Sequence, residues 1–262
     1  MSAPMQGTDI DDLSRAKRLL ETTSLAARLS DVVGQPLELA IRQLPSSATS
    51  LVDSATNAAL ERALDFATWS LGDRPGVGSS ERFHKFLAVG SGAAGGAFGL
   101  PALAVELPIS TTIMLRSIAD IARSEGASVH TIETRLDCMQ VLAFGSPRVE
   151  TDDAGDTGYL AVRAALAKAV SEAVDHIARK GVAQSSAPVL VRFLSAVGAR
   201  FGIVVSEKAA MMAVPVLGAA GGAVVNTLFM DHYQTIARGH FVVRRLERQY
   251  GIDAVLSAYR DL

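Results

Sequence analysis

Hydrophobic residues recur every three or four positions along most of this chain, the spacing that places them on one face of a helix. Residues 9–33 show the pattern first, with Ser and Asp residues available as caps, and it returns in 45–71, 111–126, 131–144 and 159–181. The alternation of period two that marks a strand is confined to short β-branched patches. The pattern predicts an all-α fold, a multi-helix bundle of about ten helices.

Two apolar segments follow, 187–204 and 207–230, and a basic helix through RGHFVVRRLERQYG ends the pattern. Residues 86–105 and 209–230 contain no charged residue and are rich in Gly and Ala. Each is long enough to cross a bilayer, yet a central helix of a soluble bundle is also apolar all round. These segments contain few of the Leu and Ile residues that favour membrane insertion. Two interpretations therefore stay open, a buried core helix and partial embedding in the membrane.

Residues 87–110, LAVGSGAAGGAFGLPALAVELPIS, contain a literal G-x-G-x-x-G. A dinucleotide site needs a strand before this motif and a helix after it, but no parallel-sheet pattern follows and Pro101 interrupts the helix. The hexapeptide GAAGGA occurs at 92–97 and again at 218–223, and small residues on a helix let another helix approach closely. The predicted packing glycines are Gly92, Gly95, Gly96, Gly218, Gly221 and Gly222.

Composition and charge restrict the possible partners and the cellular compartment of the protein. The formal net charge is -2, which supplies no basic field for nucleic acid, so no nucleic-acid partner is expected. The single cysteine, Cys138, lies in a helical pattern that buries it and indicates a reducing compartment. The first residues lack the apolar core of a secretory signal. We therefore expect a cytoplasmic protein, either peripheral to or partly embedded in the inner membrane.

Motifs that would carry catalysis are missing from the sequence. The five histidines form no H-E-x-x-H, one cysteine cannot build a Cys/His zinc cluster, and neither G-x-S-x-G nor a phosphate-binding loop is present. His232 and His240 are eight residues apart, roughly 12 Å along one helix, too far to share a metal. We predict no catalytic residue, no metal and no cofactor, and a non-enzymatic role.

Polar residues within apolar surroundings are the candidate functional cluster. Arg116 and Asp120 are four residues apart and can pair on one helix face, whereas Glu106 lies between two prolines that free backbone groups to bind it. Such residues either form structural ion pairs or line a polar cleft for a small ligand or a reaction. The candidates are Glu106, Arg116, Asp120, Arg123, Asn226, His232 and His240.

A basic stripe is predicted near the C-terminus. Arg244 and Arg248 share a helix face with His240 at spacings of four, and Arg245 is adjacent. The stripe suits the phosphates of anionic lipids, with a solvated helix face as the alternative. Lipid is therefore one expected partner.

Three segments together resemble the EcsC family of bacterial proteins: GLPALAVELPISTTIMLRSIADIARSEG, DTGYLAVRAALAKAVSEAVDHIARKG and VSEKAAMMAVPVLGAAGGAVVNTLFMDHYQTIARGHFVVRRLERQYG. The resemblance covers roughly residues 40–250. Its motifs match Gly95, Gly96, Gly99, Pro101, Glu106, Pro108, Met114 and Arg116, then Pro215, Gly218, Gly222, Asn226, His232, Gly239, His240, Arg244 and Arg245.

The resemblance implies a helical, often membrane-associated protein with no established reaction. Because the family is named for a gene neighbouring an ABC transporter, it also implies an accessory role in a transporter complex or an envelope process. The expected division is an N-terminal amphipathic helix, 1–35, outside the resemblance, and an EcsC-like helical domain, 36–262.

Overall fold

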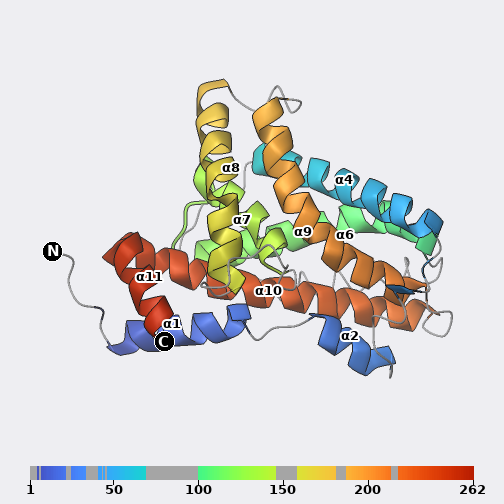
Figure 1. Ribbon diagram of the computed structural model, residues 1–262, viewed down its shortest axis with the longest axis horizontal. Coiled ribbons are helices and arrows are strands. Elements are labelled where there is room, and N and C mark those ends of the chain that lie inside the picture. Colours follow the sequence, from blue (N-terminus) through green and yellow to red (C-terminus); the bar gives the residue numbers. More distant parts are fainter. Residues whose placement is uncertain are drawn as a thin grey trace.

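The computed structural model describes residues 5, 7–21, 25–33, 41–42, 44, 46–68, 100–145, 158–180, 187–213 and 218–262. Within these ranges the chain forms nine α-helices and one short 3-10 helix, with no strand (Figure 1). They are α1 (Gly7–Glu21), α2 (Leu25–Val33), α4 (Ser46–Thr68), η1 (Leu100–Ala102), α6 (Leu103–Ser124), α7 (Ile132–Phe144), α8 (Gly158–Lys180), α9 (Pro188–Met212), α10 (Gly218–Tyr250) and α11 (Ile252–Asp261). The predicted all-α bundle is confirmed.

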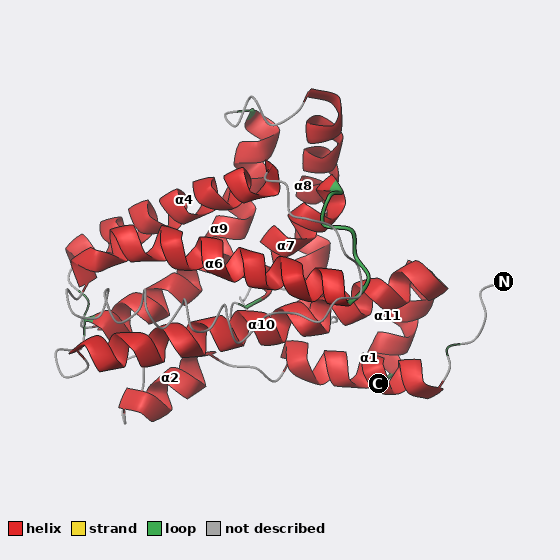
Figure 2. Cartoon of the chain, turned by 180° about the vertical axis from the view of Figure 1, so that it is seen from behind, coloured by secondary structure: helices red, strands yellow, loops and turns green. Residues whose placement is uncertain are grey.

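The longest element, α10, is the helix against which most of the others pack. It has 33 residues, about 50 Å at the rise of an α-helix, and contacts α1, α2, α6, α7, α9 and α11. Side-chain contacts from Glu106 to Asn226 and from Glu125 to Arg245 show that α6 runs parallel to it. The N-terminal ends of α6 and α10 and the C-terminal end of α9 therefore meet at one end of the molecule, whereas α1 and α11 lie at the other (Figures 1 and 2).

Small residues let α4 pack closely against its neighbours. Its buried face is built on Ala55, Ala59 and Ala63, and the helix lies along α6 and α9. Because Ala has no side chain beyond Cβ, the helix axes can approach closely, as the Ala-rich composition predicts. Helix α4 also matches the predicted 45–71 closely.

Helix α6 begins earlier than its sequence pattern indicates and ends where predicted. It starts at Leu103 rather than near residue 111, and Pro108 lies inside it. Because proline has no backbone N–H, Pro108 cannot donate to the carbonyl four residues earlier, as another residue at this position would. At the other end, Gly126 adopts φ +76°, and Ala127 N–H donates to the Ala122 carbonyl. This is the predicted glycine stop.

Two predicted boundaries are wrong. The single helix expected over 9–33 is described as two helices, since α1 ends at Glu21 and α2 begins at Leu25. The break expected at 205–206 does not occur, because α9 continues to Met212. Helix α10 starts at Gly218 and combines the end of the second apolar segment and the basic segment in one helix.

The packing glycines fall partly outside the described residues. Gly92, Gly95 and Gly96 lie there, as does the G-x-G-x-x-G motif at 90–95. Gly218, Gly221 and Gly222 lie in the first two turns of α10, so the second GAAGGA copy is helical. Gly221 and Gly222 are buried. Contact between the two copies stays a prediction.

Another glycine holds α1 against α10. A Cβ atom on Gly239 would lie 2.6 Å from Leu20 Cγ and 3.0 Å from the Ala16 carbonyl oxygen, so only glycine allows this approach. At the same face, Arg245 donates to Asp12 and Tyr250 donates to Asp9. Helix α1 is therefore part of the same bundle as α10.

Candidate functional site

A buried ion pair joins α6, α9 and α10 where these helices meet. Lys208 Nζ lies 2.7 Å from Glu106 Oε2, and Asn226 Nδ2 donates to Glu106 Oε1, also at 2.7 Å. The Lys208 ammonium lies 4.7 Å from the centre of the Phe229 ring and 3.5 Å from Ser110 Oγ. The side chains of Lys208 and Glu106 are 2% and 5% exposed, so the cluster is almost completely withdrawn from water.

Helix geometry favours both charges of this cluster. Glu106 lies in the first turn of α6, where the helix dipole favours an anion, and Lys208 lies near the C-terminal end of α9, where it favours a cation. Both oxygens of the Glu106 carboxylate already accept hydrogen bonds from side chains. The arrangement therefore neutralises a buried carboxylate and fixes the position of three helices relative to one another.

Sequence reasoning found Glu106 and Asn226 but missed Lys208. We expected backbone groups beside the prolines to bind Glu106, and the structure instead supplies the side chains of Lys208 and Asn226. The available signal was the charged pair of residues Glu207 and Lys208 at the start of the apolar 207–230 segment, where a buried charge requires a partner.

A second polar network joins α7, α8 and α10. Arg163 makes a bidentate pair with Glu247, at 2.6 and 2.8 Å, and Arg244 bridges Glu247 and Asp137 at 2.9 and 2.8 Å. Beside them, Tyr159 Oη lies 2.8 Å from His240 Nδ1. The network contains two arginines and two carboxylates, so its formal charges cancel when both acids are ionised.

Burial shifts the ionisation of several groups in this second network. It lowers the pKa of His240 well below its usual value, with a further contribution from the charges of Arg163 and Arg244. It raises the pKa of Asp137, against the opposing charge of Arg244. The His240 ring is therefore neutral at pH 7 and acts as a hydrogen-bonding partner of Tyr159. Cys138, which follows Asp137 in α7, is buried, as predicted, and burial raises the pKa of its thiol.

His232 has a different location and partner. Its Nε2 atom lies 2.8 Å from the carbonyl oxygen of Gly145, at the end of α7, so Nε2 carries the proton. Burial lowers the pKa of His232 to about 4. A Cβ atom on Gly145 would lie 2.7 Å from Nε2, so this hydrogen bond requires glycine at the end of the helix. His232 thus connects α7 to α10.

The seven candidate residues do not meet in one cleft. Glu106 and Asn226 are in contact, whereas His232 and His240 each bind a different partner. On α6, Asp120 pairs with Arg123 three residues away, while Arg116 is partly buried on the same helix. Within the described ranges, no group of three or more His, Cys, Asp or Glu side chains could hold a metal ion.

The arginines of the predicted lipid stripe are engaged inside the protein. Arg244 pairs with Asp137 and Glu247, and Arg245 pairs with Asp12 and Glu125, at 2.5 and 2.8 Å. Exposed Arg248 donates to the backbone carbonyl of Glu125, while His240 is buried. Lipid phosphates at this stripe stay a prediction, and they would compete with these ion pairs.

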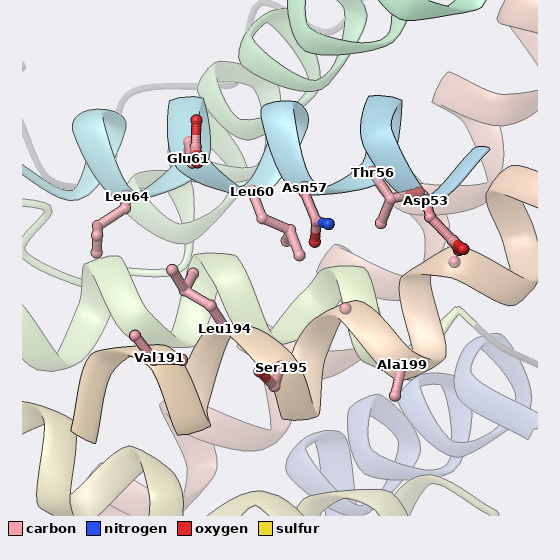
Figure 3. A pocket seen from close by; sticks show the side chains of 12 residues that line it. Asp53, Thr56, Asn57, Leu60, Glu61, Leu64, Val191, Leu194, Ser195 and Ala199 are labelled. Carbon is pink, nitrogen blue, oxygen red and sulfur yellow. The ribbon is translucent and has the colours of Figure 1, made fainter. Parts of the chain in front are cut away.

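A surface groove of about 1040 Å³ runs between α4 and α9 (Figure 3). Helix α4 lines one end with the polar residues Asp53, Thr56 and Asn57 and continues with leucines toward its C-terminal half. Helix α9 faces these residues with Val191 and Leu194 and then with a run of small residues. None of the predicted site residues lines this groove, and the sequence pattern alone did not single it out.

Comparison with known proteins gives one match. The model of the EcsC protein family matches residues 8–246. No curated protein and no solved structure matches the chain. The family match begins within α1, so it includes N-terminal residues that the sequence resemblance does not cover. Because it spans most of the chain, the protein belongs to the EcsC family.

Proposed function

We propose that this EcsC-family protein is a non-enzymatic, membrane-associated helical protein that embeds one end of its bundle in the inner membrane from the cytoplasmic side. The observation that carries the proposal is the exposure of large apolar side chains on the N-terminal halves of α6 and α10. Helices α6 and α9 are each long and apolar enough to cross a membrane. In the most apolar 18-residue window of α9, mean hydropathy is 1.7, yet only 33% of the residues are buried.

The two apolar helices differ in burial, and the exposed positions of α9 (188, 191, 192, 195 and 199) lie in its N-terminal half, whereas residues 207–211 are buried. A helix that is apolar all round is usually covered by its own protein or by lipid. The corresponding window of α6 has a mean hydropathy of 1.3 and is 56% buried, so it is better covered. Large apolar side chains are also exposed on the N-terminal halves of α6 and α10, namely Val105, Ile109 and Val224.

These exposed residues mark what we call the uncharged end, formed by residues 103–115, 209–212 and 218–230. It contains one charged residue, Glu106, which is buried and paired with Lys208. The other half of α10, residues 231–250, contains six charged residues, Asp231, Arg238, Arg244, Arg245, Glu247 and Arg248. This polarity along one helix supports partial insertion with the charged half left in water.

A role accessory to a transporter or envelope process is part of the proposal and is supported by the family relationship alone. The competing function, an enzyme or lipid-binding protein with a cleft at the predicted polar cluster, receives less support. Its residues are dispersed, and both oxygens of Glu106 are already bound by other side chains.

Liposome flotation of the full chain tests the membrane proposal. We expect co-flotation with phosphatidylcholine vesicles that persists at high salt, because apolar contact is not screened. An Asp at mid-bilayer costs roughly 3 kcal/mol, so Val105→Asp and Ile109→Asp should each lower the bound fraction at least tenfold. Ile252→Asp is the matched control, since Ile252 is also exposed but begins α11 at the opposite end.

Two results would contradict the proposal. A protein that stays unbound to every vesicle would leave α9 as an exposed helix of a soluble bundle. Binding that needs anionic lipid, disappears in salt and ignores Val105→Asp would instead assign the contact to the arginine stripe.

A further inference from the structure

We infer that the groove between α4 and α9 is a binding site for a single-chain amphiphile with a primary ammonium headgroup. The inference does not depend on membrane insertion, because none of the residues that line the groove belongs to the uncharged end. Its volume of about 1040 Å³ is sufficient for a ligand of this size.

The polarity of the groove changes along its length. Asp53, Thr56 and Asn57 are at spacings of three and four, which places them on one face of α4. The same face continues one turn later with Leu60 and Leu64, which point toward α9 in Figure 3. From residue 53 to residue 64 the groove face is about 16 Å long, a length suited to a headgroup and a medium alkyl chain.

The wall that α9 contributes to the groove is also apolar at one end and built from small residues at the other. Val191 and Leu194 of α9 lie across from the leucines of α4, and the smaller Ala199 lies toward Asp53 (Figure 3). Gly202 continues the small-residue run, and a Cβ atom there would meet nothing within 4 Å. The wide end of the groove is therefore the polar end, which suits a headgroup, while the alkyl chain lies between leucine and valine side chains.

Charge determines which headgroup the groove favours. Its described lining includes two carboxylates, Asp53 and Glu61, and no lysine or arginine. Asp53 forms no ion pair with another described residue. An ammonium group can donate to the Asp53 carboxylate and to the Asn57 side-chain carbonyl, whereas a sulfate or phosphate would meet no lining cation.

An unsatisfied hydroxyl inside the groove is independent support for a ligand. Thr56 is only 5% exposed, and its Oγ1 atom has no hydrogen-bond partner among the described residues. The side chain points from α4 toward α9 in Figure 3. Buried hydroxyls normally have a partner, and a headgroup donor at this end of the groove would supply one.

Isothermal titration of the full chain with dodecylammonium, below its micelle concentration, tests the site. We expect one saturable site, with dodecyl sulfate of equal chain length binding at least tenfold more weakly. Asp53→Asn should weaken dodecylammonium binding about tenfold, as expected for loss of one charge-assisted hydrogen bond. Asp175→Asn removes an exposed carboxylate from α8 outside the groove and should leave the affinity unchanged.

Thr56→Val separates ligand binding from folding. The substitution keeps the shape of the side chain and removes a hydroxyl that has no described partner, so the thermal midpoint should stay the same or rise. Affinity for dodecylammonium should nevertheless fall severalfold. Ala199→Trp, at an exposed position, should fill the wide end and abolish binding, with Ser195→Trp as a second blocking variant.

A free alkylamine and an ethanolamine lipid share this ammonium chemistry. Titration with lysophosphatidylethanolamine distinguishes them. If it binds more tightly than dodecylammonium, and Asp53→Asn abolishes this binding, the ligand is a membrane lipid. If it binds more weakly than dodecylammonium, the ligand is a free amphiphile. The inference is overturned by absent dodecylammonium binding, equal binding of dodecyl sulfate, or indifference to Asp53→Asn. A change of oligomeric state in Ala199→Trp, measured by sedimentation, would assign the groove to a second copy of the chain.

Discussion

The ammonium group of Lys208 lies 2.7 Å from a carboxylate oxygen of Glu106, between two helices whose contacting residues are 102 positions apart in the sequence. Both side chains are buried, and the other carboxylate oxygen accepts from Asn226. Removing two ions from water is costly, and the cost is offset only while each ion retains its partners. The stability of this region therefore depends on the pair remaining intact.

Removing one charge of the pair should destabilise the protein strongly. Lys208→Met leaves Glu106 buried without its counter-ion, and we expect the free energy of unfolding to fall by about 3–5 kcal/mol. Adding Glu106→Gln should restore most of the loss, since the amide is neutral and can still accept from Asn226. Urea unfolding of both single variants and the double variant gives the coupling energy. Additive losses would show that the two charges do not interact.

His232 should make stability depend on pH. Its pKa is about 4 in the folded protein, whereas a histidine in the unfolded chain has a pKa near 6.5, so below pH 6.5 the unfolded state binds more protons. The contribution of neutral His232 is complete above about pH 6.5 and is lost as the pH falls toward 4, by on the order of 3 kcal/mol. His240, whose pKa is also lowered, acts in the same direction.

His232→Gln isolates this effect, because the Gln amide can still donate to Gly145 but does not titrate in this range. Urea unfolding of wild type and variant between pH 7.5 and 4.5 should show the wild type losing more stability with each step down. Parallel pH profiles for the two proteins would contradict the assignment of the proton-linked loss to His232.

Gly239→Ala should loosen the contact between α1 and α10. The new methyl group would meet Leu20 and the backbone of Ala16, a collision that costs about 1–3 kcal/mol. Gly202→Ala is the matched control, because its methyl group meets nothing within 4 Å and alanine has the higher helix propensity. Thermal unfolding should therefore give a lower midpoint for Gly239→Ala and an equal or higher one for Gly202→Ala. Equal midpoints would contradict close packing at Gly239.

The arginines of the basic stripe should differ in their effect on stability. Arg244→Gln removes an ion-pair partner from both Asp137 and Glu247, and we expect the free energy of unfolding to fall by about 2–3 kcal/mol. The loss is smaller than for a fully buried pair because the Arg244 side chain is 27% exposed. Arg248→Gln, at an exposed position, should change stability by no more than about 0.5 kcal/mol. Chemical unfolding of the two variants checks this. If Arg248→Gln were the more damaging change, the ion-pair account of Arg244 would be wrong.

Much of the fold could be predicted because helix formation depends on nearby residues. The spacing of apolar positions gave α4, α7 and α8 close to their observed bounds, and Gly126 marked the end of α6. The errors concerned where one helix ends and the next begins: α1 ends at Glu21 and α2 begins at Leu25, and α9 continues to Met212. The candidate site was harder to predict, because it depends on which helix faces are brought into contact.

The helical class, the burial of Cys138 and membership in the EcsC family follow from the amino-acid sequence, since propensity, periodicity and motif are properties of contiguous residues. The contact of Lys208 with Glu106, that of Arg244 with Asp137, and the groove between α4 and α9 depend instead on how the helices pack. These contacts join residues about 100 or more positions apart. Hydrophobic burial aligns the helices without regard to individual charges, and each polar residue then pairs with whichever partner the packed helices bring within hydrogen-bonding distance.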